Sequence, residues 1–206
     1  MVSGRLRMCL KESIKWILAS ASPRRKELFA ELVEEFEILP STAEEVVEGT
    51  PTPMELVQKL ACLKAREVSL REETVGKAVL GADTVVALDG KVLGKPKDEE
   101  DAFRMLSALS GKTHEVCTGV CMRFLKESGE WVELVDSAST KVHFASLTKE
   151  EILAYIATGS PMDKAGAYGI QDGGLVEKIE GSFSNVVGLP VELCKEMLKQ
   201  FSKLTN

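Results

Sequence analysis

The stretch AVLGADTVVALDG, residues 78–90, constrains the fold more than any other part of the sequence. From Val79 to Leu88 it is apolar on both faces, which is typical of a strand buried inside a sheet. Asp89-Gly90 is a two-residue hairpin signal, and the chain then returns through Lys91-Val92-Leu93. Strands and helices alternate along the 206 residues, of which 44% are hydrophobic, so we expect an α/β or α+β domain.

Capping and turn residues mark the other expected elements. Ser22 and Pro23 begin a helix that we expect to run from a strand over 16–20 to about residue 33, with Leu28 and Leu32 on its buried face. Thr52 and Glu55 form a capping box for a second helix. The remaining expected elements are a helix over 98–109, an antiparallel pair over 114–125 and 131–144, a helix from 148 to 159, an irregular Gly-rich stretch over 160–188 with a strand near 175–179, and a last helix opened by Pro190.

Composition excludes several classes of function. A net charge of -6 argues against wrapping DNA or RNA, which depends on neutralising many phosphates. No stretch reaches the roughly 20 apolar residues of a membrane span, and the first 15 residues lack the apolar core of a signal peptide. The cysteines lie at scattered positions, so we expect free thiols and a cytoplasmic protein: Cys9, Cys62, Cys117, Cys121 and Cys194.

Asp83 and Lys64 stand out by their positions. Asp83 lies in the middle of the apolar strand, where a carboxylate is costly unless it is paired or binds a metal ion. Perturbed buried carboxylates gather at functional sites, although an Asp that caps a backbone group is the structural alternative. Lys64 falls on the apolar stripe of the second helix, and its alternative is a side chain that extends along the helix to water.

Two arginines at the start of a helix indicate an anionic ligand. That end of a helix already carries a positive partial charge, so Arg24 and Arg25 are unfavourable there unless something negative binds. A helix N-terminus together with these cations and carboxylates suits a metal-bound polyphosphate: Lys64, Lys95, Glu44, Glu45 and Asp83. Lys95, Glu44 and Glu45 would alone be interpreted as ordinary surface groups. The SGKT at 110–113 is no P-loop, because position 106 is Leu where a P-loop needs Gly.

Four segments together resemble the Maf family of nucleoside triphosphate pyrophosphatases: LASASPRRKELF, GADTVVALDGKVLGKP, SGKTHEVCTGV and DKAGAYGIQ with the later VEKIEGSFSNVVGLP. The resemblance covers about residues 16–200 and leaves residues 1–15 as an N-terminal extension. It implies a single domain over 16–206 of the α/β class, with a mixed, strongly curved β-sheet flanked by helices. Two lobes would then surround a cleft, as in the inosine triphosphatase-like fold.

The resemblance also implies a reaction and the residues for it. A nucleoside triphosphate would be hydrolysed to the monophosphate and pyrophosphate with Mg²⁺ or Mn²⁺. Asp83 matches the catalytic position, as water-activating base, as metal ligand or as both, and Glu45 and Asp83 match metal-binding positions. The other matching positions would bind the substrate: Ser22, Arg24, Arg25, Lys64, Thr84, Lys95, Lys164 and Gln171.

Arg24, Thr84 and Gln171 resemble the branch of the family that hydrolyses dTTP and UTP, with modified pyrimidine nucleotides as further candidates. The branch for 7-methyl-GTP carries an apolar residue, a Gln and a Glu at these places. The chemistry agrees at Gln171, because a neutral amide both donates to and accepts from a uracil or thymine edge. We expect a small nucleotide as ligand, a homodimer, and neither a nucleic acid polymer nor a membrane as partner.

Three alternatives accompany this interpretation. A nucleotide-sensing regulator of septum formation would bind without much catalysis, and an intact set of Asp83, Glu45 and Lys95 argues against it. A pyrophosphatase for another nucleotide, such as 7-methyl-GTP, would use the same residues on a different base. An RNA-binding protein would need exposed aromatic residues among its basic ones, which the sequence lacks.

Overall fold

Seven strands form one mixed sheet within residues 14–205, the part of the chain that the computed structural model describes. The strand order is β2-β1-β3-β5-β6-β7, and β4 pairs with β3. β1 is parallel to both β2 and β3, and the other pairs are antiparallel. The strands are β1 (Lys15–Leu18), β2 (Phe36–Ile38), β3 (Lys77–Leu88), β4 (Lys91–Leu93), β5 (Thr113–Leu125), β6 (Trp131–Phe144) and β7 (Val176–Glu180).

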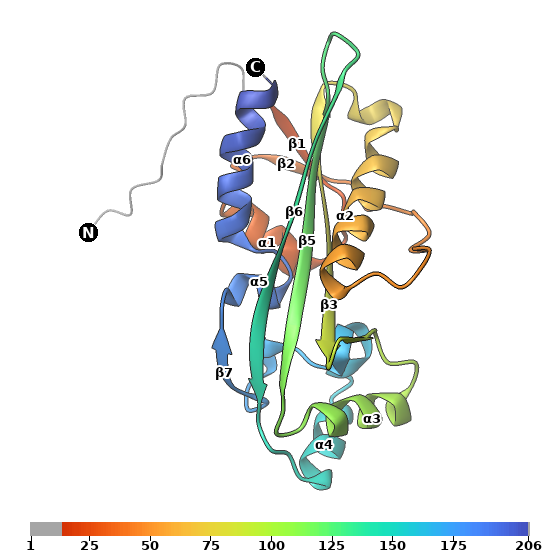
Figure 1. Cartoon of the computed structure of the whole chain (residues 1–206), viewed down its shortest axis with the longest axis vertical. Helices are drawn as coiled ribbons and strands as arrows, with labels where there is room; N and C mark the ends of the chain where they lie inside the picture. Colours follow the sequence, from red (N-terminus) through yellow and green to blue (C-terminus); the bar gives the residue numbers. More distant parts are fainter. Residues whose placement is uncertain (1–13, 206) are drawn as a thin grey trace, which may run out of the picture.

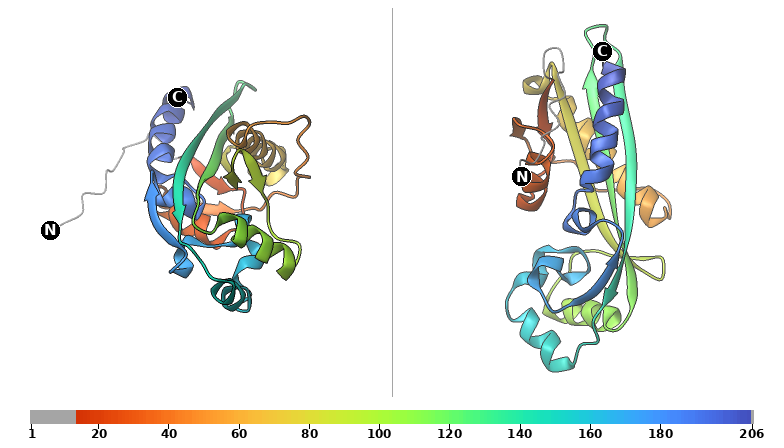
Figure 2. Two further views of the ribbon diagram at one scale, coloured as in Figure 1. Left: turned by 60° about the horizontal axis from the view of Figure 1, so that its bottom comes forward. Right: turned by 90° about the vertical axis from the view of Figure 1, so that its left-hand side faces the viewer.

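Helices cover both faces of this sheet. Figure 1 shows β3, β5 and β6 along the long axis of the molecule, with α2 beside them. The views in Figure 2 place α6 and α2 on opposite faces, in agreement with the alternation along β3, where Val79 packs with α2 residues and Leu80 with α6 residues. The helices are α1 (Pro23–Ala30), α2 (Pro53–Ser69), α3 (Glu99–Leu109), α4 (Lys149–Ile156), α5 (Phe183–Val187) and α6 (Val191–Thr205).

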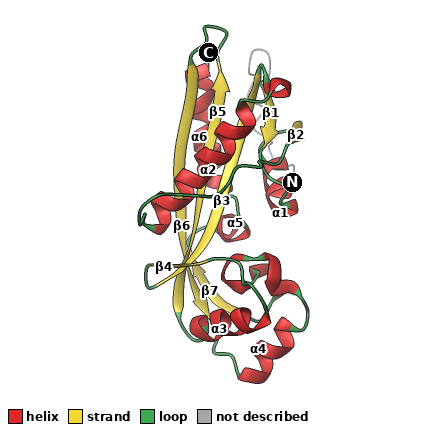
Figure 3. Ribbon diagram, turned by 90° about the vertical axis from the view of Figure 1, so that its right-hand side faces the viewer, coloured by secondary structure: helices red, strands yellow, loops and turns green. Residues whose placement is uncertain are grey.

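Two ends of the long strands carry separate hydrophobic cores. At one end, Trp16 packs against Phe29 of α1 and Phe201 of α6. At the other end, α3, α4 and β7 enclose a core around Leu106, Phe144 and Ile152, as Figure 3 shows for the elements. This arrangement confirms the expected mixed α/β sheet with flanking helices. None of the helices within the described residues is long and apolar enough to span a bilayer.

Most of the predicted elements are present, and the differences are local. The helix that begins at Pro23 ends at Ala30, three residues before the predicted end, and its fully buried residue is Phe29, whereas Leu28 and Leu32 are only half-buried. β2 and α5 were not predicted, because a three-residue strand and a five-residue helix are too short to give a periodic pattern. The proposed extension over 1–15 and Cys9 fall almost wholly outside the described residues.

The edge of β3 has a gap that opens the sheet. β1 pairs with β3 only as far as Leu80, and β4 joins only from Val86. Between them, residues 81–85 pair with β5 on one side and have no strand on the other within the described part of the chain. A strand that is central by its apolar sequence thus exposes a short stretch of one edge, and Asp83 and Thr84 lie in that stretch.

Candidate active site

A cleft of about 1040 Å³ lies at this gap in the sheet. Its walls come from the corner between β1 and α1, from α2, β3 and the loop after β4, and from the irregular segments near 163–172 and 186–188. All ten site residues that the sequence predicts line this cleft: Ser22, Arg24, Arg25, Glu45, Lys64, Asp83, Thr84, Lys95, Lys164 and Gln171. Residues up to 149 positions apart in the sequence are therefore brought to one cavity.

Lys64 lies between two carboxylates at the centre of the cleft. Its ammonium donates to Asp83 and lies 2.8 Å from Glu45. Asp83 is 8% exposed, so its charge is balanced by Lys64 rather than by bulk water. The contact between Lys64 and Asp83 explains two exceptions in the sequence pattern. Lys64 interrupts the apolar stripe of α2 and Asp83 the apolar run of β3, and each provides the partner of opposite charge that the other needs.

Two glycines allow α2 to approach the sheet closely enough for this contact. A Cβ on Gly81 would lie 2.4 Å from the carbonyl oxygen of Ala61, and a Cβ on Gly119 would lie 2.3 Å from that of Val57. Helix backbone thus rests on strand backbone, with no side chain between them at these points. Lys64, one turn further along α2 than Ala61, is thereby held against Asp83.

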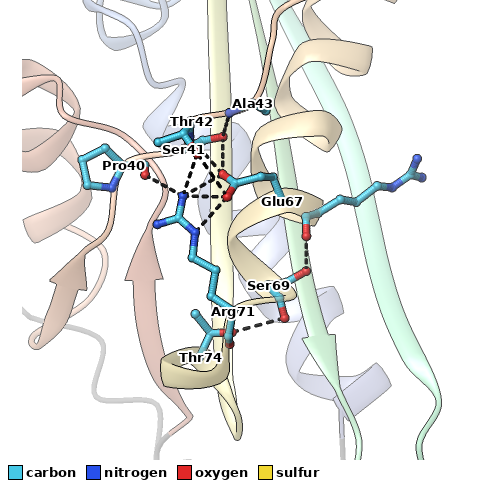
Figure 4. Close-up of polar contacts among 9 residues, drawn as sticks. Pro40, Ser41, Thr42, Ala43, Glu67, Ser69, Arg71 and Thr74 are labelled. Atoms are coloured by element: carbon cyan, nitrogen blue, oxygen red, sulfur yellow. Dashed lines mark hydrogen bonds and ion pairs between the residues drawn. The ribbon is translucent and has the colours of Figure 1, made fainter.

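The loop that carries Glu45 is fixed to the C-terminal half of α2 by a set of ionic hydrogen bonds, drawn in Figure 4. Glu67 accepts from the Ser41 hydroxyl at 2.8 Å and from the Thr42 backbone N–H at 3.0 Å. Arg71 donates to both Glu67 oxygens at 2.8 Å and to the Pro40 carbonyl at 3.1 Å. These hydrogen bonds lower the pKa of Glu67 against the opposing effect of its burial, and keep it charged. The anchored residues precede Glu45 by a few positions and direct its loop towards the cleft.

Arg25 enters the cleft from the N-terminal turn of α1, on the other side of β3 from Lys64. Ser22 caps this helix by accepting from the backbone N–H of Arg25 at 3.4 Å. The guanidinium donates to the Gly188 carbonyl at 2.9 Å, to the Thr84 hydroxyl at 3.0 Å and to the Ser20 hydroxyl at 3.3 Å. Burial lowers its pKa, and the nearby Asp83 carboxylate acts in the opposite direction. All three acceptors are neutral, so the positive charge of Arg25 remains uncompensated by direct contact.

Of the residues that orient Arg25, Thr84 was predicted as a site residue, whereas Ser20 and Gly188 were not. Gly188 has φ +126°, a conformation that side chains rarely adopt, and it accepts from Arg25. The hydroxyl of Thr84 is 2.9 Å from that of the buried Thr118, which in turn donates to the Asn185 carbonyl at 3.1 Å. The sequence gives no signal for these contacts, because they join residues far apart in the chain through backbone atoms and hydroxyls.

Polar residues of the irregular stretch 160–172 form the opposite wall. Lys164 contacts Asp163 at 2.9 Å and donates to the Ser160 carbonyl at 2.6 Å. Asp172 accepts from the Tyr155 and Ser160 hydroxyls, and burial with the Asp172 contact raises the pKa of Tyr155 to about 12.

Lys95 and Gln171 complete the lining and are both exposed. The Gly166 N–H bonds the Gly94 carbonyl at 2.9 Å, and this contact ties the loop of Lys95 to the wall of Lys164. Both side chains are exposed in the cleft and can meet a ligand there.

The donor groups in the cleft fit a hard divalent cation. Glu45 and Asp83 converge on one point, occupied here by the Lys64 ammonium, and carboxylate oxygens are the ligands that Mg²⁺ and Mn²⁺ prefer. Another group of possible ligands, Cys62, Cys121 and Glu133, lies outside the cleft lining and offers sulfur, which suits softer metals.

Known proteins resemble this chain in sequence and in fold. The family model described as "Maf-like protein" matches residues 15–201. A dTTP/UTP pyrophosphatase of Thermococcus gammatolerans is 53% identical over 179 residues, which are 86% of this chain and 91% of the relative. A dTTP/UTP pyrophosphatase of Anaeromyxobacter sp. is 48% identical and covers 91% of this chain and 90% of its own length. The solved structure of a HAM1 protein from Coxiella burnetii matches 91% of this chain and all of its own, with 16% identity and a TM-score of 0.50, so it bears on the fold alone.

Proposed function

The chain belongs to the Maf family, and on that premise we propose that it is a nucleoside triphosphate pyrophosphatase that hydrolyses dTTP and UTP to the monophosphate and pyrophosphate. Relatives at about half identity over most of both chains bear the name dTTP/UTP pyrophosphatase. The observation that carries the proposal is the grouping of Lys64, Glu45 and Asp83 in one cleft with the unpaired charge of Arg25. A nucleotide sensor would need the cations but not a buried carboxylate set against them.

We propose that the triphosphate binds along the cations of the cleft. Arg25 presents a guanidinium whose acceptors are all neutral, so phosphate oxygens can take up its charge with little rearrangement. Lys64, Lys95 and Lys164 would neutralise further phosphate charge from α2, from the loop after β4 and from the opposite wall. Ser22 and the first turn of α1 would contribute the polarity of a helix N-terminus.

Asp83 is proposed to orient and deprotonate the attacking water. Its carboxylate lies at the bottom of the cleft and is held by a single ammonium, so one oxygen remains to accept from water. The water oxygen would attack the α-phosphorus, the bond to the bridging oxygen would break, and pyrophosphate would leave with its negative charge balanced by Arg25 and Lys64.

A divalent cation, Mg²⁺ or Mn²⁺, is part of the proposal. Glu45 and Asp83 would hold it, since both already bind one cationic group together. When bound, such an ion neutralises phosphate charge and makes the phosphorus a better electrophile.

We assign the pyrimidine preference to Gln171, Arg24 and Thr84. Gln171 is exposed on the wall of the cleft, where its amide is free to pair with the carbonyl and N–H groups of uracil or thymine. Thr84 lines the same cleft and accepts a hydrogen bond from Arg25, so it would act through the position of that guanidinium. A polar pocket matched in this way rejects a base with the wrong donors, because buried partners are then left unpaired.

The test is a panel of canonical and modified nucleoside triphosphates incubated with the purified chain and Mg²⁺ or Mn²⁺, with a chelator as control. We expect fastest release of pyrophosphate from dTTP and UTP and none with the chelator. Tight nucleotide binding by calorimetry without turnover of any of them would instead favour a sensor, and a preference for 7-methyl-GTP would retain the reaction but refute the assignment of the base.

Three organisational proposals accompany this function: residues 16–206 form a single two-lobed domain, the chain assembles as a homodimer, and it acts in the cytoplasm. Light scattering on a sizing column distinguishes a 22.5 kDa monomer from a dimer of twice that mass. Cooperative unfolding with one transition by both fluorescence and circular dichroism would support the single domain.

A further inference from the structure

Two thiols meet where α2 packs on β5, outside the lining of the cleft. The sulfur atoms of Cys62 and Cys121 and a carboxylate oxygen of Glu133 all lie within 4.8 Å of one another. Cys62 is half-buried and Cys121 is fully buried. None of the three lines the candidate active site, so the proposed function leaves this cluster unexplained.

The close packing of α2 brings these two cysteines together. Cys121 on β5 is paired in register with Gly81 on β3, and Gly81 is where the backbone of α2 at Ala61 rests on the sheet. Cys62 follows Ala61 directly. A disulfide requires Cα atoms about 4.4–6.8 Å apart, and direct contact between helix backbone and sheet favours such short separations.

The charges around the cluster favour thiolate chemistry over metal binding. Both oxygens of Glu133 are already engaged, since Arg66 donates to them at 2.8 and 2.5 Å and Arg123 donates at 2.5 Å. A cation that bound Glu133 would have to displace these guanidiniums and remain beside two positive charges. An anionic sulfur is instead favoured by Arg66 and Arg123, which act against the unfavourable charge of the Glu133 carboxylate.

The geometry assigns Cys62 and Cys121 as a dithiol that is converted to an internal disulfide by exchange with a small disulfide of the glutathione class. The Cys62 thiolate attacks one sulfur of the oxidant, whose S–S bond breaks and releases one small thiolate. The Cys121 thiol then gives up its proton and attacks the Cys62 sulfur, and the second small thiolate leaves and is protonated. Two electrons pass from the cysteines to the oxidant, and two small thiols are produced.

The two thiols differ in the way that such a sequence requires. The hydrogen bond with Cys121 lowers the pKa of Cys62, against the opposing effects of burial and of Glu133, and Arg66 and Arg123 also lower it. That bond and burial raise the pKa of Cys121. The accessible member thus attacks first and the buried member resolves the mixed disulfide. Cys117 and Cys194 are buried, and burial raises the pKa of each, so they serve as internal controls.

The experiment is oxidation of the folded full-length chain with glutathione disulfide, alkylation of the remaining thiols, and mapping of tryptic peptides by mass spectrometry. The peptide 60–64 contains only Cys62, and the peptide 113–123 contains Cys117 and Cys121. We expect these two peptides to be joined in the wild type, in Cys117→Ser and in Cys194→Ser, and to separate on reduction. Cys121→Ser should stop at a glutathione adduct on Cys62, and Cys62→Ser should form neither product.

Several results would overturn the assignment. They are a wild type that stops at the glutathione adduct, a link from Cys62 to Cys9, and loss of the joined peptide in Cys117→Ser.

The oxidised protein should also melt higher than the reduced one by roughly 5–15 °C, because the disulfide closes a long loop in the unfolded chain. A Cd²⁺–thiolate absorption band that is lost in both Cys62→Ser and Glu133→Gln would assign a metal site in its place.

Discussion

Lys64 of α2 and Asp83 of β3 neutralise each other at the bottom of the cleft, and the same ammonium lies 2.8 Å from Glu45. The pair has a direct consequence for the proposed reaction. Whatever occupies the cleft must share Lys64 between the phosphates and the two carboxylates. The proposed proton acceptor, Asp83, and the proposed phosphate-binding cation, Lys64, are thus in direct contact, and a change at either should affect both.

Replacement of Asp83 by Asn should lower kcat by at least about a hundredfold, because the amide has nearly the same shape but neither charge nor base strength. Steady-state release of pyrophosphate from dTTP measures the effect. Asp89→Asn, in the hairpin turn after β3, is the matched control and should retain activity. Circular dichroism should show both variants folded, and wild-type turnover in Asp83→Asn would remove this residue from the mechanism.

Hydrolysis in ¹⁸O-labelled water should place the label in the monophosphate and leave pyrophosphate unlabelled. The reason is that the proposed attack occurs at the α-phosphorus, with pyrophosphate as the leaving group. Mass spectrometry of both products measures the distribution. Label in pyrophosphate would mean attack at the β-phosphorus, and release of orthophosphate with a nucleoside diphosphate would mean that the substrate lies in the cleft in another register.

Gln171→Glu, combined with an apolar residue at position 24 and Thr84→Gln, should reduce kcat/KM for dTTP and UTP more than for 7-methyl-GTP. A carboxylate cannot donate to a pyrimidine carbonyl, whereas it suits the positive ring and donor groups of 7-methylguanine. Gln171→Glu alone isolates the base contact from the effects on Arg25 that Thr84 transmits. An equal loss on all three substrates would show that these positions support the fold of the cleft and not its selectivity.

Thr118→Val should destabilise the protein by about 1–3 kcal/mol, because it leaves the buried carbonyl of Asn185 and the hydroxyl of Thr84 without one of their partners. Urea denaturation measures the change. Thr50→Val, in an exposed loop, is the control and should stay within about 0.5 kcal/mol of the wild type. Equal midpoints for both variants would contradict the role given to this hydroxyl.

His114 should make stability fall between about pH 6.5 and pH 4. It is 2% exposed beside Tyr168, and burial lowers its pKa to about 4. In the unfolded chain the imidazole of His114 is protonated below about pH 6.5, whereas in the folded protein it stays neutral down to about pH 4. The free energy of unfolding is therefore unaffected by this group above about pH 6.5 and decreases as the pH falls, by up to about 3 kcal/mol.

Urea denaturation from pH 7 to pH 4 measures this dependence. His114→Phe should flatten the pH dependence of stability. His143→Gln leaves the buried imidazole of His114 in place and should retain most of that dependence. Carboxylates contribute in the same direction at the acid end, so the difference between the variants is the relevant quantity. Parallel curves for all three proteins would show that His114 is not responsible.

The main elements and a few of the candidate site residues could be predicted from local marks, whereas Thr84, Lys164 and Gln171 entered only through the resemblance to the family. The capping box at Thr52 fixes the start of α2, and Lys64 and Asp83 each interrupt an apolar pattern that the structure otherwise keeps. Arg24 and Arg25 conflict with the dipole of their own helix. Such conflicts between local preference and sequence are where binding residues are expected.

The supports of the site could not be predicted, because they depend on tertiary contacts. Gly188 holds Arg25 through a carbonyl oxygen, which every residue has, and the hydroxyl of Thr118 looks like that of any strand threonine. The gap in the sheet beside Asp83 arises from where β1 ends and β4 begins, and strand ends are poorly marked in sequence.

The three long strands set how the walls of the cleft can move. β3, β5 and β6, of 12, 13 and 14 residues, run from the core under α6 to the core under α3 and α4. No single loop joins those two halves, so they cannot swing about a few freely rotating bonds as hinged domains do. The two halves can change their relative orientation only by twisting and bending the sheet itself. The sheet therefore deforms elastically as a whole, and the resistance to bending is shared by the hydrogen bonds between its strands.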